Sequence, residues 1–139
     1  MVRAGVNVSD CEADWESNYR IPDVAVFLSG TSARNRDSHW LGGPDFVVEI
    51  RSPNDESREK LPFYAGVGVK ELLLLDRSPW SLELYQLQGG QLVLAGKSTA
   101  KTMESLESSV LPLHFRLIPG ESRPRIEVTH ADGTDRWVV

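Results

Sequence analysis

The chain has 139 residues, of which 40% are hydrophobic and 25% are charged, and its net charge is -5. This length predicts a single domain over residues 1–139 with one hydrophobic core. The negative charge argues against a general nucleic-acid coat protein. It leaves a nuclease open, because carboxylates that hold a metal count as negative until the metal binds.

Apolar runs are far shorter than the roughly 20 residues of a membrane span. Residues 1–10 lack the apolar core of a signal peptide, and the single Cys11 cannot form an internal disulfide, so we expect a cytoplasmic protein.

The first part of the chain predicts a short strand, a longer strand and then a long loop. Residues 2–8 alternate weakly and allow a short strand, and residues 21–28 predict a longer strand that begins near Pro22. The polar stretch 29–43 predicts a long loop, which is either an exposed surface loop or a phosphate-facing loop with an aromatic that can stack. Its candidate residues are Arg34, Arg36, His39 and Trp40.

The next predicted strand, residues 45–51, has one apolar face and an opposite face that carries Glu49. A helix over residues 55–65 should follow, capped by Asn54 or Asp55, with Pro62 bending it or making its first half irregular. The residues that share one face of this helix at a spacing of four are Glu56, Lys60 and Tyr64.

The second half of the chain predicts mostly strands. Residues 69–76 are apolar on both faces, which is typical of a strand covered on each side. Gly89-Gly90 predicts a hairpin turn between strands at 80–87 and 91–95, and further strands are expected at 113–117, 126–128 and 136–139. We therefore predict an α+β fold with a mixed sheet, few flanking helices and a β-rich C-terminal half.

Asp23 and Glu49 lie on neighbouring predicted strands, and Lys60 follows on the helix. Two carboxylates can hold Mg²⁺ or Mn²⁺, with the carbonyl of Ile50 as a further oxygen ligand, and a lysine nearby can orient a water for phosphodiester hydrolysis. Arg51 cannot act as a base but can contact a phosphate. The structural alternatives stay open: a turn aspartate, a Glu49 paired with Arg51 or Arg20, a solvated Lys60 and a core Tyr64.

The segments RIPDVAVF, GPDFVVEIRSP and REKLPFYAGVGVKELLLLD together resemble the Uma-two family of restriction-endonuclease-like proteins. The resemblance implies the PD-(D/E)XK nuclease fold and DNA as substrate. It places Asp23 and Glu49 at the acidic positions, Lys60 at a lysine that has moved to the helix, and Tyr64 at the family tyrosine. Arg51 occupies the usual lysine position of the wider superfamily.

The family domain usually begins with helices that carry another acidic residue, and we expect these helices to be missing before Ile21. This difference predicts a homodimer, in which a second copy covers the sheet. Three functions remain open: a Mg²⁺-dependent endonuclease, a catalytically inactive nuclease-fold module for binding or dimerisation, and an unrelated β-rich interaction domain. The last would use Trp40, Trp80 and Trp137 as a contact surface.

Overall fold

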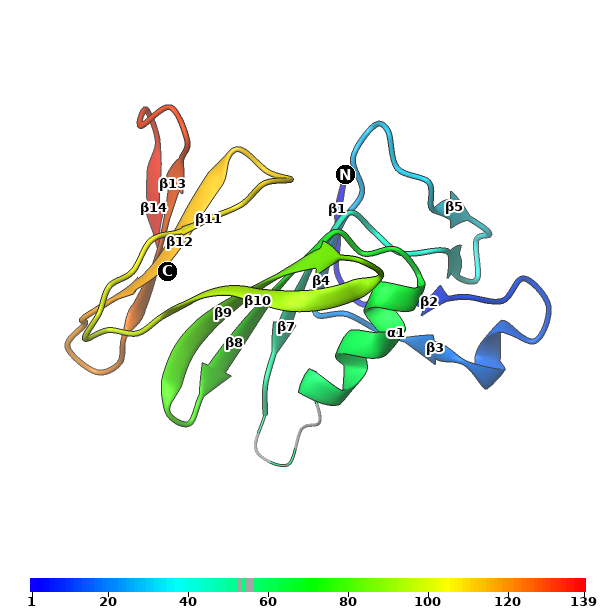
Figure 1. The fold of residues 1–139 in the computed structure, drawn as a ribbon, viewed down its shortest axis with the longest axis horizontal. Helices are drawn as coiled ribbons and strands as arrows, with labels where there is room; N and C mark the ends of the chain where they lie inside the picture. Colours follow the sequence, from blue (N-terminus) through cyan, green and yellow to red (C-terminus); the bar gives the residue numbers. More distant parts are fainter. Residues whose placement is uncertain (53, 55–56) are drawn as a thin grey trace.

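A six-stranded mixed sheet forms the centre of the molecule (Figure 1). The computed structural model describes residues 1–52, 54 and 57–139. The strands follow the order β1-β4-β7-β8-β9-β10, in which β7 and β8 are parallel and the remaining neighbours are antiparallel. They span Val2–Arg3 (β1), Val24–Val26 (β4), Phe46–Ile50 (β7), Glu71–Arg77 (β8), Trp80–Gln88 (β9) and Gln91–Ser98 (β10).

Strand β8 is buried on both faces, as its leucine run predicts. Leu73 belongs to one hydrophobic cluster and Leu72 to a second, because successive side chains of a strand point to opposite faces. Each buried leucine contributes roughly 1.5–3 kcal/mol relative to an exposed one. The position of β8 between β7 and β9 therefore fixes the middle of the sheet and, with it, the end of β7.

One helical segment joins β7 to β8 and covers one face of the sheet (Figure 1). It begins as the 3₁₀ helix η2 (Ser57–Lys60) and continues as α1 (Leu61–Gly66). The irregular first half expected from Pro62 is confirmed: this proline lies in the first turn of α1, where its missing N–H breaks no intrahelical hydrogen bond. The expected cap Asp55 and the face residue Glu56 lie outside the described residues.

A second, four-stranded antiparallel sheet packs on the other face of the central sheet and stands at one end of Figure 1. Phe115 of this sheet stacks on Phe46 with ring centroids 5.9 Å apart. The carboxylate of Glu71 also accepts hydrogen bonds from the hydroxyl of Ser108 at 2.5 Å and the backbone N–H of Val110 at 3.0 Å, which ties the two sheets together. Its strands are β11 (Leu106–Glu107), β12 (Leu113–Ile118), β13 (Arg125–His130) and β14 (Arg136–Val138).

A third, small sheet of two-residue strands lies at the opposite end of the molecule (Figure 1) and corrects the predicted loop over residues 29–43. Trp40 stacks on Phe27 with centroids 3.8 Å apart, and the buried His39 stacks on Trp15. The phosphate-facing interpretation of these two side chains is therefore wrong, because both pack inward. The sheet consists of β2 (Val8–Ser9), β3 (Tyr19–Arg20), β5 (Arg34–Asn35) and β6 (Trp40–Leu41), and the 3₁₀ helix η1 (Trp15–Ser17) precedes β3.

Strand β10 forms one edge of the central sheet and exposes Val93 and Leu94, at 40% and 49% of their surface. Exposed edge strands can pair with another chain. The homodimer remains a prediction. Within the described parts of the chain, no helix has the length and apolar character needed to cross a membrane.

Candidate active site

Asp23 and Glu49 oppose each other across β4 and β7. The antiparallel register pairs Val24 with Val48 and Ala25 with Val47, so the next position outward pairs Asp23 with Glu49. Side chains directly opposite in such a pair have Cβ atoms about 4.5–5.5 Å apart on one face of the sheet. This is the face covered by α1, because Val47 packs with Tyr64 in the same cluster. The two carboxyl groups therefore converge at the end of β7.

The Asp23 carboxylate is held by the backbone. Its Oδ2 accepts a hydrogen bond from the N–H of Ile50 at 2.7 Å. In an extended strand the N–H and C=O of one residue point to the same neighbour. The carbonyl of Ile50 therefore points to the same side as Asp23, while the next N–H, from Arg51, points to β8 and donates to Leu75. The Ile50 carbonyl and the carboxylates of Asp23 and Glu49 are therefore three possible oxygen ligands at one corner of the sheet.

Glu49 is 2% exposed and has two partners on the helical segment. The hydroxyl of Tyr64 donates a hydrogen bond to Oε1, and Nζ of Lys60 lies 3.8 Å from Oε2. These partners come from one helical face, since Lys60 and Tyr64 are four residues apart where η2 continues into α1. Arg51, a partner that the sequence left open for Glu49, instead donates to Asp76 at 2.9 Å.

Burial raises the pKa of Glu49 to about 7. The hydrogen bond from Tyr64 and the charge of Lys60 oppose the effect of burial, while the charge of Asp23 and a hydrogen bond between the two carboxyl groups reinforce it. Burial and the bond to Glu49 also raise the pKa of Tyr64, which keeps this phenol protonated and able to donate. Glu49 can therefore hold a proton near neutral pH.

The carboxyl pair has the donor chemistry that a magnesium site needs. Asp23 and Glu49 offer hard carboxylate oxygens, and Ile50 offers a neutral carbonyl oxygen on the same side. A divalent cation could replace the proton on Glu49. Among the described residues, no cluster of three or more His, Cys, Asp and Glu residues could hold a metal ion. Any Mg²⁺ here would keep several waters, as Mg²⁺ usually does.

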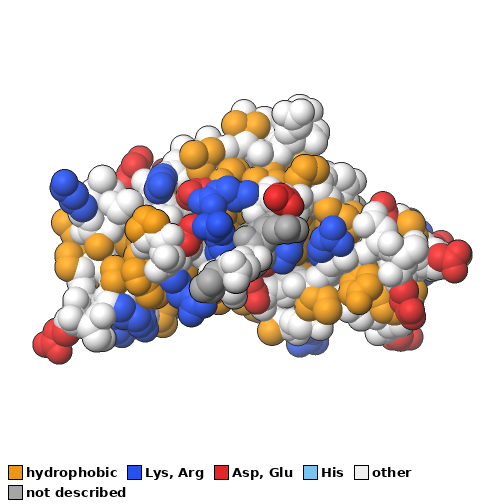
Figure 2. Space-filling view, turned by 90° about the horizontal axis from the view of Figure 1, so that it is seen from below, with side chains coloured by type: hydrophobic (Ala, Val, Ile, Leu, Met, Phe, Trp, Pro, Cys, Tyr) orange, Lys and Arg blue, Asp and Glu red, His pale blue; other side chains and the backbone are white. Residues whose placement is uncertain are grey.

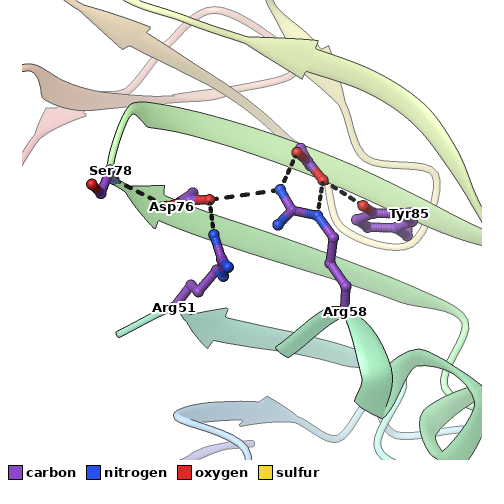
Figure 3. A network of polar contacts seen from close by, with 6 residues as sticks. Arg51, Arg58, Asp76, Ser78 and Tyr85 are labelled. Atoms are coloured by element: carbon purple, nitrogen blue, oxygen red, sulfur yellow. Dashed lines mark hydrogen bonds and ion pairs between the residues drawn. The ribbon is translucent and has the colours of Figure 1, made fainter. Parts of the chain in front are cut away.

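A second polar network lies beside the carboxyl pair on the same face of the sheet (Figure 3). Nη2 of Arg58 lies 2.6 Å from Oε1 of Glu83 and 3.6 Å from Oδ2 of Asp76, and Arg51 holds the same Asp76 oxygen. Tyr85 donates to Glu83. The network thus attaches η2, which ends in Lys60, to β8 and β9.

The acids of this network are ionised in the folded protein. Burial alone would raise the pKa of Asp76, but hydrogen bonds from the Ser78 amide and Arg51 lower it below its usual value. Burial likewise opposes ionisation of Glu83, but Arg58 and Tyr85 lower its pKa. Sequence reasoning missed Arg58, Asp76 and Glu83 as a unit. The sequence signal for this network was Glu83, an acidic residue at an inward position of an apolar strand, two residues before Tyr85.

The mixed sheet with a helical crossover between its two parallel strands is the architecture of a nuclease-like fold. The chain belongs to the Uma2 family, described as "Putative restriction endonuclease", whose model matches residues 2–117. A solved structure described as a putative nuclease belonging to DUF820 from Anabaena variabilis ATCC 29413 is similar in fold, with a TM-score of 0.52 and 17% sequence identity. The match covers 68% of this chain and 53% of that one, so it extends over about half of the solved structure. No curated protein matches the chain.

The raised pKa of Glu49 predicts a pH-dependent stability. An ordinary glutamate has a pKa of 4.5, against about 7 in the folded protein, so the fold holds the proton more tightly than the unfolded chain does. The resulting stabilisation is complete below pH 4.5 and is lost as the pH rises through about 7. It amounts to at most about 3 kcal/mol. Urea unfolding in EDTA should therefore show that wild type loses stability relative to Glu49→Gln as the pH rises from 5 to 8. A pH-independent gap would contradict the assignment.

Proposed function

We propose that this protein is a metal-dependent endonuclease that hydrolyses phosphodiester bonds in DNA. The observation that supports this best is the convergence of Asp23, Glu49 and Lys60 at the end of β7. Family membership points to a nuclease. Asp23, Glu49 and the Ile50 carbonyl would hold Mg²⁺ or Mn²⁺. The ion would supply charge relief at the phosphate and an acidified water.

The remaining residues would act around these ligands. Lys60 carries a positive charge beside Glu49 and would orient the attacking water or assist its deprotonation. Tyr64 fixes the rotamer of Glu49 through its hydrogen bond. Arg51 stays charged and would contact a phosphate oxygen at the rim, next to its ion pair with Asp76.

The direct test is nicking of supercoiled plasmid DNA in Mg²⁺ or Mn²⁺. Wild type should nick in either ion and not in EDTA, and Glu49→Gln, which keeps the shape of the side chain, should not nick. Glu104→Gln, at an exposed position, removes one charge elsewhere and should nick like wild type. Metal binding without any nicking would favour the alternative function, a catalytically inactive nuclease-fold module. Nicking that persists in Glu49→Gln would contradict the proposed site.

A further inference from the structure

A hollow of about 360 Å³ lies between the end of the central sheet and the C-terminal sheet. Ile50 and Trp80 contribute apolar walls from the central sheet, and Ile126 and Val139 contribute them from the C-terminal sheet. Arg77 and Arg123 add two guanidinium groups. An apolar slot with cationic groups at its wall matches a flat ring that carries a phosphate, which is the chemistry of a nucleotide.

Trp80 presents a ring face that a planar cation already contacts. The guanidinium carbon of Arg123 lies 5.8 Å from the centroid of the indole. Arg123 is exposed, and its side chain donates only to the neighbouring Pro124 carbonyl among the hydrogen bonds found in the described chain. The loop that presents it is tight, because a Cβ on Gly120 would clash with the Arg123 carbonyl oxygen. A nucleobase could therefore take the place of this guanidinium over the indole, and the arginine could turn to the attached phosphate.

The hollow lies at the same end of β7 as the carboxyl pair, on the opposite face of the central sheet. Ile50 lines it while its backbone N–H donates to Asp23, and the preceding residue, Glu49, faces the α1 side. Arg77 also lines a neighbouring hollow of about 410 Å³ together with Arg51. A DNA strand that leaves the first hollow would thus pass Arg77 and Arg51 as it turns around the ends of β7 and β8 toward the face that carries the carboxyl pair.

The charge on this side of the molecule favours a polyanion. The chain has a net charge of -5, yet Figure 2, which views the molecule from below, shows Lys and Arg side chains near the middle of this face, with Asp and Glu side chains beside them. β7 and β8 both end on this side (Figure 1). Basic side chains gathered on one face can attract the phosphates of a nucleic acid.

We propose that this hollow is a stacking subsite for one unpaired nucleobase of a DNA strand, with Trp80 as the platform and Arg77 and Arg123 on its phosphate. The inference rests on the proposed nuclease function, which it extends to a strand with an unpaired base held around the sheet end from the scissile phosphate. The walls formed by Ile126 and Val139, together with Arg123, come from residues beyond the stretch matched by the family model.

Equilibrium binding in EDTA tests the subsite without any cleavage. Fluorescently labelled single-stranded DNA of eight nucleotides is compared by anisotropy with the same backbone lacking its bases. Wild type should bind the intact strand about tenfold more tightly, which is the magnitude of one stacked base. Trp80→Leu should remove this preference while keeping an apolar side chain against the core. Arg123→Ala should weaken both ligands more than Arg3→Ala, a matched change at an exposed arginine on β1.

The outcomes separate the subsite from the nuclease function. Equal binding of the intact and baseless strands by wild type overturns the stacking subsite, even if plasmid nicking succeeds. The same holds if folded Trp80→Leu retains the preference. If Trp80→Leu fails to fold, Arg123→Ala decides: an effect no larger than that of Arg3→Ala overturns the proposal. Failure of plasmid nicking with an intact base preference would reject the nuclease and leave the binding subsite.

Discussion

Lys60→Ala is expected to lower metal-dependent DNA nicking by at least about a hundredfold while leaving metal binding nearly unchanged. A positioned group that assists proton transfer contributes typically 10²–10⁴-fold to the rate. Lys60 lies 3.8 Å from Glu49 and is not itself an oxygen ligand, so its removal should spare the cation. The measurement is the single-turnover nicking rate in saturating Mn²⁺, beside a calorimetric Mn²⁺ titration of the same variant.

Lys101→Ala is the matched control for this prediction. Lys101 is exposed in the turn after β10, and its loss changes the net charge equally. Nicking by Lys101→Ala should stay within a fewfold of wild type. If Lys60→Ala nicks as fast as this control, or if it loses Mn²⁺ affinity as strongly as a carboxylate variant, the role given to Lys60 is wrong.

Arg58→Ala is expected to cost about 2–3 kcal/mol of folding stability. Glu83 and Asp76 are only 5% and 6% exposed, and both contact the Arg58 guanidinium. Removing one partner of a buried ion pair costs about 3–5 kcal/mol, because a buried charge is left uncompensated. The lower figure applies because the Arg58 side chain is itself 41% exposed, so water reaches the space it leaves. Urea unfolding at pH 7 measures the loss.

Two further variants sharpen this result. Arg58→Lys keeps the charge but not the fork that holds Glu83 through two nitrogens, so it should fall between alanine and wild type. Arg36→Ala breaks an ion pair of 2.7 Å with the exposed Glu12 and should cost less than about 1 kcal/mol. Equal losses for Arg58→Ala and Arg36→Ala would show that the buried network contributes no more than a surface pair.

Alternation of side chains made the central sheet predictable. The inward position of Glu49 followed from its apolar neighbours in the strand, and the leucines of β8 indicated a strand covered on both faces. The predicted strands at 80–87 and 91–95 pair as a hairpin around Gly89, whose φ of +58° suits glycine. These features depend on residues close together in sequence, which local patterns report well.

Long-range pairing limited the rest of the prediction. β6 lies in a stretch expected to be loop, and it forms by pairing in parallel with β2, more than thirty residues earlier in the chain. Arg58 and Glu83 are separated by 25 residues and meet only in the folded chain, where the Arg58 side chain extends from η2 to β8 and β9 (Figure 3). The periodicity of one segment carries no information about such partners. The family resemblance identified Lys60 as a candidate, but only the structure shows that Arg58 attaches the helical segment carrying Lys60 to β8 and β9.

The central claim is that Asp23 and Glu49 together hold one divalent cation. The most direct measurement is a calorimetric titration of Mn²⁺ into wild type, Asp23→Asn and Glu49→Gln at pH 7.5. Both replacements keep the side-chain shape, and in Asp23→Asn the amide oxygen would still accept the hydrogen bond from the Ile50 N–H. We predict one weak site in wild type that each substitution removes. Binding of equal strength in all three proteins, or no binding in wild type, would contradict the claim.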